Sequence, residues 1–163
     1  MGSSDVFPPQ LKFFRQDLDV IYKTLPESRQ DSFWRTLCMD CDWTQECPVF
    51  PAPTDYGLKQ RVCFGYEPVP ADYEPHKPEN ERIFDFIQPF LLSMQMVLMH
   101  RTFIILGDGS MGVGPFLAQA GDTVAVLYGA PYCVVVRPVG SQYKLVGDAY
   151  VHGLMHGECV AGN

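Results

Sequence analysis

The sequence has little positive charge, no uninterrupted apolar run of membrane length and no signal peptide. Twelve Lys and Arg side chains stand against 19 Asp and Glu, for a net charge of -7 at pH 7. Because phosphate groups are bound by basic surfaces, this balance argues against nucleic acid and anionic membranes as partners. The most apolar stretch, residues 83–99, is interrupted by polar side chains and is shorter than the ~20 residues of a membrane span. Residues 1–10 lack a basic start and an apolar core, so we expect a cytoplasmic protein.

Cysteine is too scattered to form a structural framework. In a reducing compartment the six cysteines are expected to be free thiols rather than disulfides. Four of them could supply thiolates to zinc: Cys38, Cys41, Cys47 and Cys63. The spacing after Cys41 is short and Cys63 stands far away, so reduced or buried thiols are the better interpretation. His152 and His156 are also metal-ligand types, but the glycines beside them disfavour a regular helix. We therefore expect neither a metal nor a cofactor.

Glycine is scarce in the first 100 residues, which contain 3 of the 14 glycines. Apolar side chains at steps of three and four predict a helix from Leu11 to Leu25, and Pro26 is well placed near the start of a second helix. Residues 79–100 predict a further helix, whose apolar face consists of Phe84, Ile87, Leu91, Met94 and Leu98. Seven of the 14 prolines lie in residues 48–78, which predicts a long irregular connection.

The other 11 glycines follow residue 100 and separate short β-branched or aromatic runs. Five runs have strand length: Phe103–Leu106, Thr123–Tyr128, Cys133–Arg137, Tyr143–Gly147 and Tyr150–Val151. Their spacing predicts a small β-barrel over residues 101–158. Packed against the helical residues 10–100, it would complete one α+β domain spanning residues 1–163. Gly107–Gly112 matches G-x-G-x-x-G, but Pro115 follows too soon for the helix that a nucleotide site needs, so a hairpin turn is the better interpretation.

A series of motifs recurs from Arg101 onward. They are Arg101-Thr102, Gly112-Val113-Gly114-Pro115, Gly121-Asp122-Thr123-Val124, Gly129, Arg137-Pro138, Tyr143-Lys144-Leu145-Val146-Gly147, Tyr150-Val151-His152-Gly153 and Gly157-Glu158. In this order they resemble the C-terminal region of fungal heterokaryon-incompatibility (HET) proteins, and Phe33–Leu37 is similar to a weaker helical motif of that region. The chain departs from the pattern at Asp148, where the family usually has Glu, and at His156, where an acidic residue is common. The resemblance does not reach the family's N-terminal TIR-like domain, so we do not expect that domain's signalling activity here.

The strongest polar constellation is Arg137, Asp148, Tyr150, His152 and Glu158, within or next to the predicted strands. Strand alternation places Asp148, Tyr150 and His152 on one face. In a shared apolar environment a carboxylate, a phenol and an imidazole can carry acid/base chemistry, with His152 as the catalytic group, helped by Asp148 or Tyr150. Arg137 and Glu158 would bind the substrate. The alternative is a hydrogen-bonded network that serves the fold.

Two functions are compatible with these residues. The first is a cofactor-free isomerase, cyclase or lyase that acts on an apolar small molecule, for instance in secondary metabolism. It is favoured because a chain without the signalling domain must contain its own activity. The second is a non-catalytic protein-interaction or regulatory module of heterokaryon incompatibility. The expected partner is therefore an apolar small molecule or another protein, while the oligomeric state is not predicted.

Overall fold

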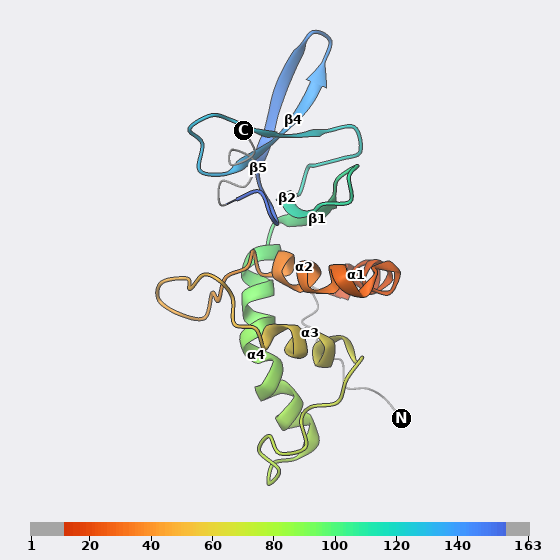
Figure 1. The fold of residues 1–163 in the computed structure, drawn as a ribbon, viewed down its shortest axis with the longest axis vertical. Helices are drawn as coiled ribbons and strands as arrows, with labels where there is room; N and C mark the ends of the chain where they lie inside the picture. The colour runs from red at the N-terminus through yellow and green to blue at the C-terminus, as the bar shows by residue number, and fades with distance from the viewer. Residues whose placement is uncertain (1–11, 156–163) are drawn as a thin grey trace.

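The computed structural model describes the backbone of residues 12–155 and the side chains from Asp17 onward. In this range four helices precede five strands, which confirms the predicted α+β class. The elements are α1 (Lys12–Thr24), α2 (Glu27–Leu37), α3 (Tyr56–Phe64), α4 (Glu79–Leu98), β1 (Arg101–Ile105), β2 (Met111–Pro115), β3 (Thr123–Val126), β4 (Cys133–Val139) and β5 (Gln142–Val151). The helices gather at one end of the molecule and the strands at the other, and α4 runs from the far end of the helical part up to β1 (Figure 1).

The apolar faces of the helices meet in one core. Phe33 and Leu37 of α2 are fully buried, as are Ile87 and Met94 of α4. The predicted face of α4 is wrong at Phe84, which is 44% exposed. α4 continues through Pro89 as a single helix. No helix in residues 12–155 is both long enough and apolar enough to cross a membrane.

The predicted irregular connection over residues 48–78 contains a helix, and the prediction is wrong there. α3 occupies a stretch without proline, and Gly65 ends it in the left-handed conformation with φ of 81°. Tyr56 and Phe64 are buried, and the Tyr56 ring packs edge-on against Phe90 of α4 with centroids 5.8 Å apart. Because the helix pattern of this segment is weak, its burial against α4 explains why it folds.

The five strands form one antiparallel sheet in the order β1-β2-β5-β4-β3. The sequence did not predict β2, because its glycines disfavour a strand. A side chain at Gly112 would collide with the carbonyl oxygen of Tyr150 on β5, so the close approach of the strands requires glycine. Two predicted strands, Tyr143–Gly147 and Tyr150–Val151, join into the single strand β5. The Gly107–Gly112 motif lies in the β1–β2 hairpin, as predicted: residues 107–110 form the turn, closed by a hydrogen bond from the Leu106 amide to the Ser110 carbonyl, and Met111 and Gly112 begin β2.

The sheet has two faces with different partners. Met111 and Val113 of β2 belong to the helical core, and Phe103 of β1 packs on Phe33 with ring centroids 5.5 Å apart. On the opposite face a separate small core consists of Cys133, Val135, Ala149 and Val151. The sheet is curved but not closed within residues 12–155, since β1 and β3 are its two edges. The predicted barrel is therefore seen here as an open, barrel-like sheet.

Candidate functional site

Tyr150 and His152 lie together on the helix-facing side of β5. The Tyr150 hydroxyl is 2.9 Å from His152 Nδ1, at hydrogen-bond distance. Burial raises the pKa of the Tyr150 phenol, and the negative charge of Asp40 raises it further. The phenol therefore stays protonated at neutral pH. Of the three side chains predicted to share one face, Asp148, Tyr150 and His152, this contact brings Tyr150 and His152 together.

Asp40 is a residue of this region that the sequence reasoning missed. It follows α2 in a left-handed conformation, with φ of 52°, and its carboxylate accepts a 2.6 Å hydrogen bond from Arg35. Arg35 also lies over the Trp34 ring, 4.3 Å from its centroid. This mostly buried ion pair acts electrostatically on Tyr150: the charge of Asp40 raises the pKa of the phenol and the charge of Arg35 lowers it. In the sequence, Asp40 is marked by being an acidic residue between Cys38 and Cys41, where the cysteines alone were considered as metal ligands.

Asp148 does not share the surroundings of Tyr150. Its side chain is half-exposed and forms an ion pair of 2.5 Å with Arg101, the first residue of β1. This contact spans β2 and joins the start of β1 to β5. Exposed pairs of this kind contribute about 0–1 kcal/mol to stability. The predicted help of Asp148 to His152 stays a prediction.

Arg137 lies in a different part of the sheet. Its guanidinium donates two hydrogen bonds to Asp122, of 2.7 and 2.9 Å, and a third of 2.9 Å to the Leu117 carbonyl. Hydrogen bonding to Arg137 lowers the pKa of Asp122. The guanidinium thus fastens the β2–β3 loop to β4. Its assigned role in substrate binding stays a prediction, and Glu158 lies outside the described residues.

Of the four cysteines considered as zinc ligands, Cys38 and Cys63 are buried, Cys41 is partly buried and Cys47 is exposed. Cys38 is fully buried, and burial raises the pKa of its thiol to about 12. Cys63 of α3 is buried in the same core. Within residues 12–155 no three His, Cys, Asp or Glu side chains converge in a way that could hold a metal ion. His156 lies outside this range.

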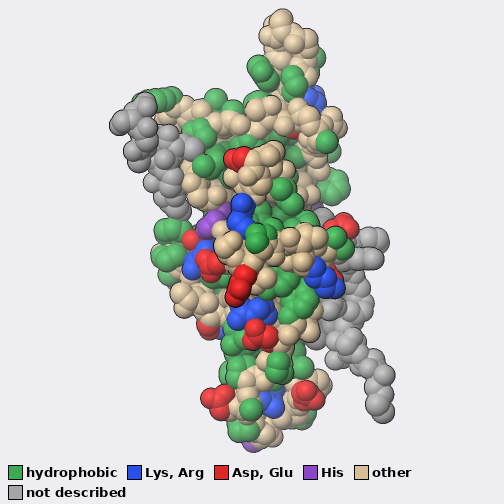
Figure 2. Space-filling view, turned by 45° about the vertical axis from the view of Figure 1, so that its right-hand side comes forward, with side chains coloured by type: hydrophobic (Ala, Val, Ile, Leu, Met, Phe, Trp, Pro, Cys, Tyr) green, Lys and Arg blue, Asp and Glu red, His purple; other side chains and the backbone are tan. Residues whose placement is uncertain are grey.

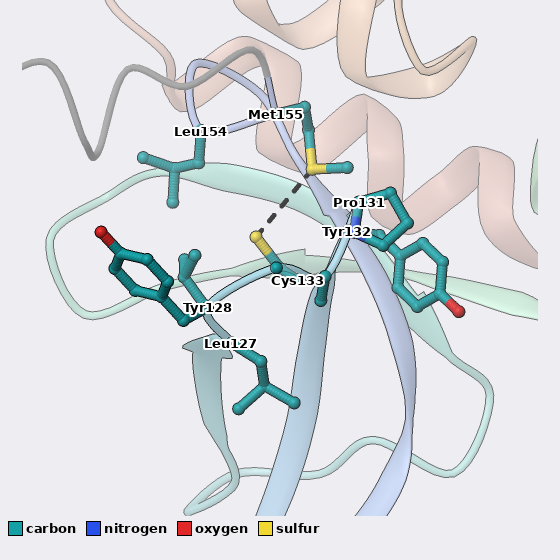
Figure 3. Close-up of a pocket in the computed structure, with 10 residues that line it drawn as sticks. Leu127, Tyr128, Pro131, Tyr132, Cys133, Leu154 and Met155 are labelled. Carbon is teal, nitrogen blue, oxygen red and sulfur yellow. Dashed lines mark hydrogen bonds between the residues drawn. The ribbon is translucent and has the colours of Figure 1, made fainter.

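Two cavities on the sheet are described here, both formed by residues within 12–155. The smaller, of about 230 Å³, lies at the β3–β4 turn and is lined by residues 126–133 with Leu154 and Met155. Figure 3 shows Cys133 near Met155, with their sulfur atoms 3.9 Å apart, and the rings of Tyr128 and Tyr132 on opposite sides. The larger cavity, of about 450 Å³, runs along β1. Neither is lined by Asp148, Tyr150 or His152.

The turns of the sheet expose large apolar side chains, and Tyr128 is 98% exposed. Four of these surround the smaller cavity and are called here the turn group: Val126, Leu127, Tyr128 and Tyr132. Three others form the tip group near the β4–β5 turn: Val139, Tyr143 and Leu145. On the face seen in Figure 2, charged side chains gather on the helical part and few lie at the sheet end. The sequence signal for this surface was the low charge after residue 100, which has three Lys and Arg and four Asp and Glu.

Comparison with known proteins agrees with the resemblance read from the motifs. Residues 71–162 match the family described as the Het-6 beta-barrel domain. The chain belongs to this family. Heterokaryon incompatibility protein 6, OR allele, of Neurospora crassa is 46% identical over 55 residues, which are 31% of this chain and 8% of that protein. No solved structure matches the chain. The match thus supports a HET-like fungal protein, while it spans a small share of the curated relative.

Proposed function

We propose that this Het-6 barrel protein is a protein-recognition module of fungal heterokaryon incompatibility and that the turn group contacts the partner. The observation that carries the proposal is the exposure of Leu127, Tyr128 and Tyr132 around one apolar cavity. Folded proteins rarely leave such apolar groups exposed without a partner. Tyrosine is also enriched at protein interfaces, because it offers a large rigid surface and a hydroxyl that remains hydrated.

The size of the cavity supports a protein partner over a small-molecule substrate. At about 230 Å³ it lies below the ~300–1,000 Å³ of typical small-molecule sites. A single partner side chain, anchored between Tyr128 and Tyr132, fits the hollow that Figure 3 shows. Among the described residues no charged side chain lines this cavity, so a partner that contacts it desolvates no charge on this lining.

The alternative is the cofactor-free enzyme expected from the sequence. One observation favours it, which is the hydrogen bond between Tyr150 and His152 beside the Arg35–Asp40 ion pair. The arrangement offers a protonated phenol and an imidazole for proton transfer. However, the two cavities described above do not reach these side chains, so we rank this function second.

Partner capture tests the proposal. The double variant Tyr128→Glu/Tyr132→Glu places two charges in the turn group, and we expect it to lose about tenfold or more of the partner protein that the wild type captures from fungal extract. Tyr143→Glu in the tip group is the matched control and should capture the same protein at the wild-type level. Both variants are first compared with the wild type by circular dichroism.

Equal capture by the folded double variant and the wild type would contradict the assignment of the turn group. Turnover of a screened small molecule by the wild type, lost in folded His152→Ala, would favour the enzyme instead.

A further inference from the structure

The outer edge of β1 has a defined hydrogen-bonding pattern. The Leu106–Ser110 bond closes the hairpin, and hydrogen-bonded pairs alternate along antiparallel strands. Ile104 therefore exchanges hydrogen bonds with Gly112 of β2, while the backbone groups of Phe103 and Ile105 point away from β2. The hydrogen bonds on the other side of β2 follow the same alternation. The Met111 carbonyl points away from β1 and accepts a hydrogen bond from the amide of His152, the residue that follows β5. In the part of the chain that the structure describes, β1 thus presents alternate N–H and C=O groups along an edge with which no other strand pairs.

The larger cavity is a slot along this edge. One wall is β1 and the start of its turn, residues 102–107, and the opposite side is formed by loop residues 118–122 and Val124 of β3. Val135 of β4 also lines it. The β1 wall is about 20 Å long at ~3.3 Å per residue. Because both β1 and loop residues 118–122 line the slot, an extended segment that lies along β1 would also contact this loop, and so would the edge of a second copy of this chain.

The charged groups that line the slot indicate which kind of side chain an occupant can carry. Among the lining residues Asp122 alone carries a charge, and its two oxygens are bound by Arg137 at 2.7 and 2.9 Å. A charged side chain entering here would lose hydration without gaining a partner. An occupant strand would direct alternate side chains toward Val124 and Val135, so these positions favour apolar residues.

We infer that an uncharged, extended segment of a partner polypeptide binds in the slot between β1 and β3 and adds a strand to β1. Its backbone would pair with Phe103 and Ile105, and its alternate apolar side chains would enter the barrel interior. The added strand would lie between β1 and β3, the two edges of the sheet described over residues 12–155. This inference deepens the proposed recognition function and rests on it for its biological role, but it concerns a surface separate from the turn group.

A model peptide tests strand addition without knowledge of the partner. The probe is an acetylated peptide of roughly eight alternating threonine and valine residues, long enough for the β1 wall, with a short lysine tail beyond it for solubility. We expect it to slow amide exchange at Phe103 and Ile105 by about tenfold or more, while Ile104, already paired with β2, changes little. A peptide of the same sequence with N-methyl groups on alternate amides should not bind, because it cannot complete the ladder.

Variants of β1 provide the matched pair. Ile105→Pro removes the outward N–H without breaking a bond to β2 and should weaken peptide binding by about tenfold or more, whereas Ile105→Val keeps the N–H and should bind as the wild type. No binding, binding of the methylated peptide, or slow exchange at Phe103 and Ile105 before peptide is added would each overturn the inference. The Tyr128→Glu/Tyr132→Glu variant should bind the peptide normally, so failure of the turn-group proposal and failure of strand addition are distinguishable.

Discussion

At the scale of single residues, glycine at position 112 decides whether β2 and β5 can lie side by side. A Cβ at Gly112 would meet the Tyr150 carbonyl oxygen and the side chains of Ile104 and Val151. Backbone atoms on a paired strand cannot move aside as the end of a flexible side chain could. The position therefore tolerates no side chain without a shift of the sheet, although glycine is intrinsically unfavourable in strands.

Substitution of Gly112 by alanine is expected to lower the free energy of unfolding by about 1–3 kcal/mol, the usual cost of overpacking. Gly107→Ala is the matched control, because nothing lies within 4 Å of its added Cβ, and it should change stability by no more than about 0.5 kcal/mol. Urea unfolding of both variants measures the difference. Equal stability of the two would show that the β2–β5 contact yields easily.

At the scale of secondary structure, α4 connects the helical core to the sheet. Its buried side chains include Ile87, Leu91 and Met94, and two residues separate the end of the helix at Leu98 from the start of β1 at Arg101. Phe84, which the sequence assigned to this face, is exposed, while Phe90 is fully buried. The sequence predicted the helix and most of its buried side chains. It did not predict the burial of Phe90, which packs against Tyr56 of α3, a helix that the sequence did not predict.

Two neighbouring leucines of α4 test this burial. Leu91 is 3% exposed and Leu92 is 43% exposed. Leu91→Ala should reduce the free energy of unfolding by about 2–5 kcal/mol, because it removes a buried side chain and leaves a cavity. Leu92→Ala should cost about 0.5 kcal/mol or less. Thermal or urea denaturation distinguishes the two, and a loss below about 0.5 kcal/mol in Leu91→Ala would place that residue outside the core.

At the scale of the whole molecule, the helices and the sheet share one core. Phe33 of α2 contacts Tyr22, Phe64 and Phe103, so a single ring packs against two other helical-part aromatics and against β1. Arg29 of α2 also donates a hydrogen bond to the Gly109 carbonyl in the β1–β2 turn. We therefore predict that residues 1–163 unfold as one domain.

Phe33→Ala tests whether the helices and the sheet unfold together. We expect a loss of about 3–5 kcal/mol, the range for a buried aromatic ring, and equal shifts of the unfolding midpoint in both parts of the molecule. Tryptophan fluorescence reports on the helical part, which contains Trp34 and Trp43, and the methyl resonances of Val135 report on the sheet. A sheet transition that stays at its wild-type midpoint would divide the chain into two independently unfolding units.

The sequence by itself determined the elements with strong local signals. Helix periodicity located α1, α2 and α4, and runs of β-branched residues located β1, β3, β4 and β5. The ordered motifs after Arg101 were enough to indicate the family. Strand alternation also placed Tyr150 and His152 together, because side chains two apart on a strand share a face whatever the fold.

Only the tertiary structure decided what depends on contacts distant in sequence. α3 has too weak a pattern to be read locally and is stabilised by packing on α4, and β2 is a strand because glycine lets it approach β5. The ion pair of Asp148 with Arg101 depends on Arg101 lying across β2, and the electrostatic effect of Asp40 on Tyr150 depends on the packing of the helices against the sheet. The position of β1 at the edge of the described sheet follows from the order of the strands. Local propensity does not determine this order, because strands pair so that their apolar faces are buried together.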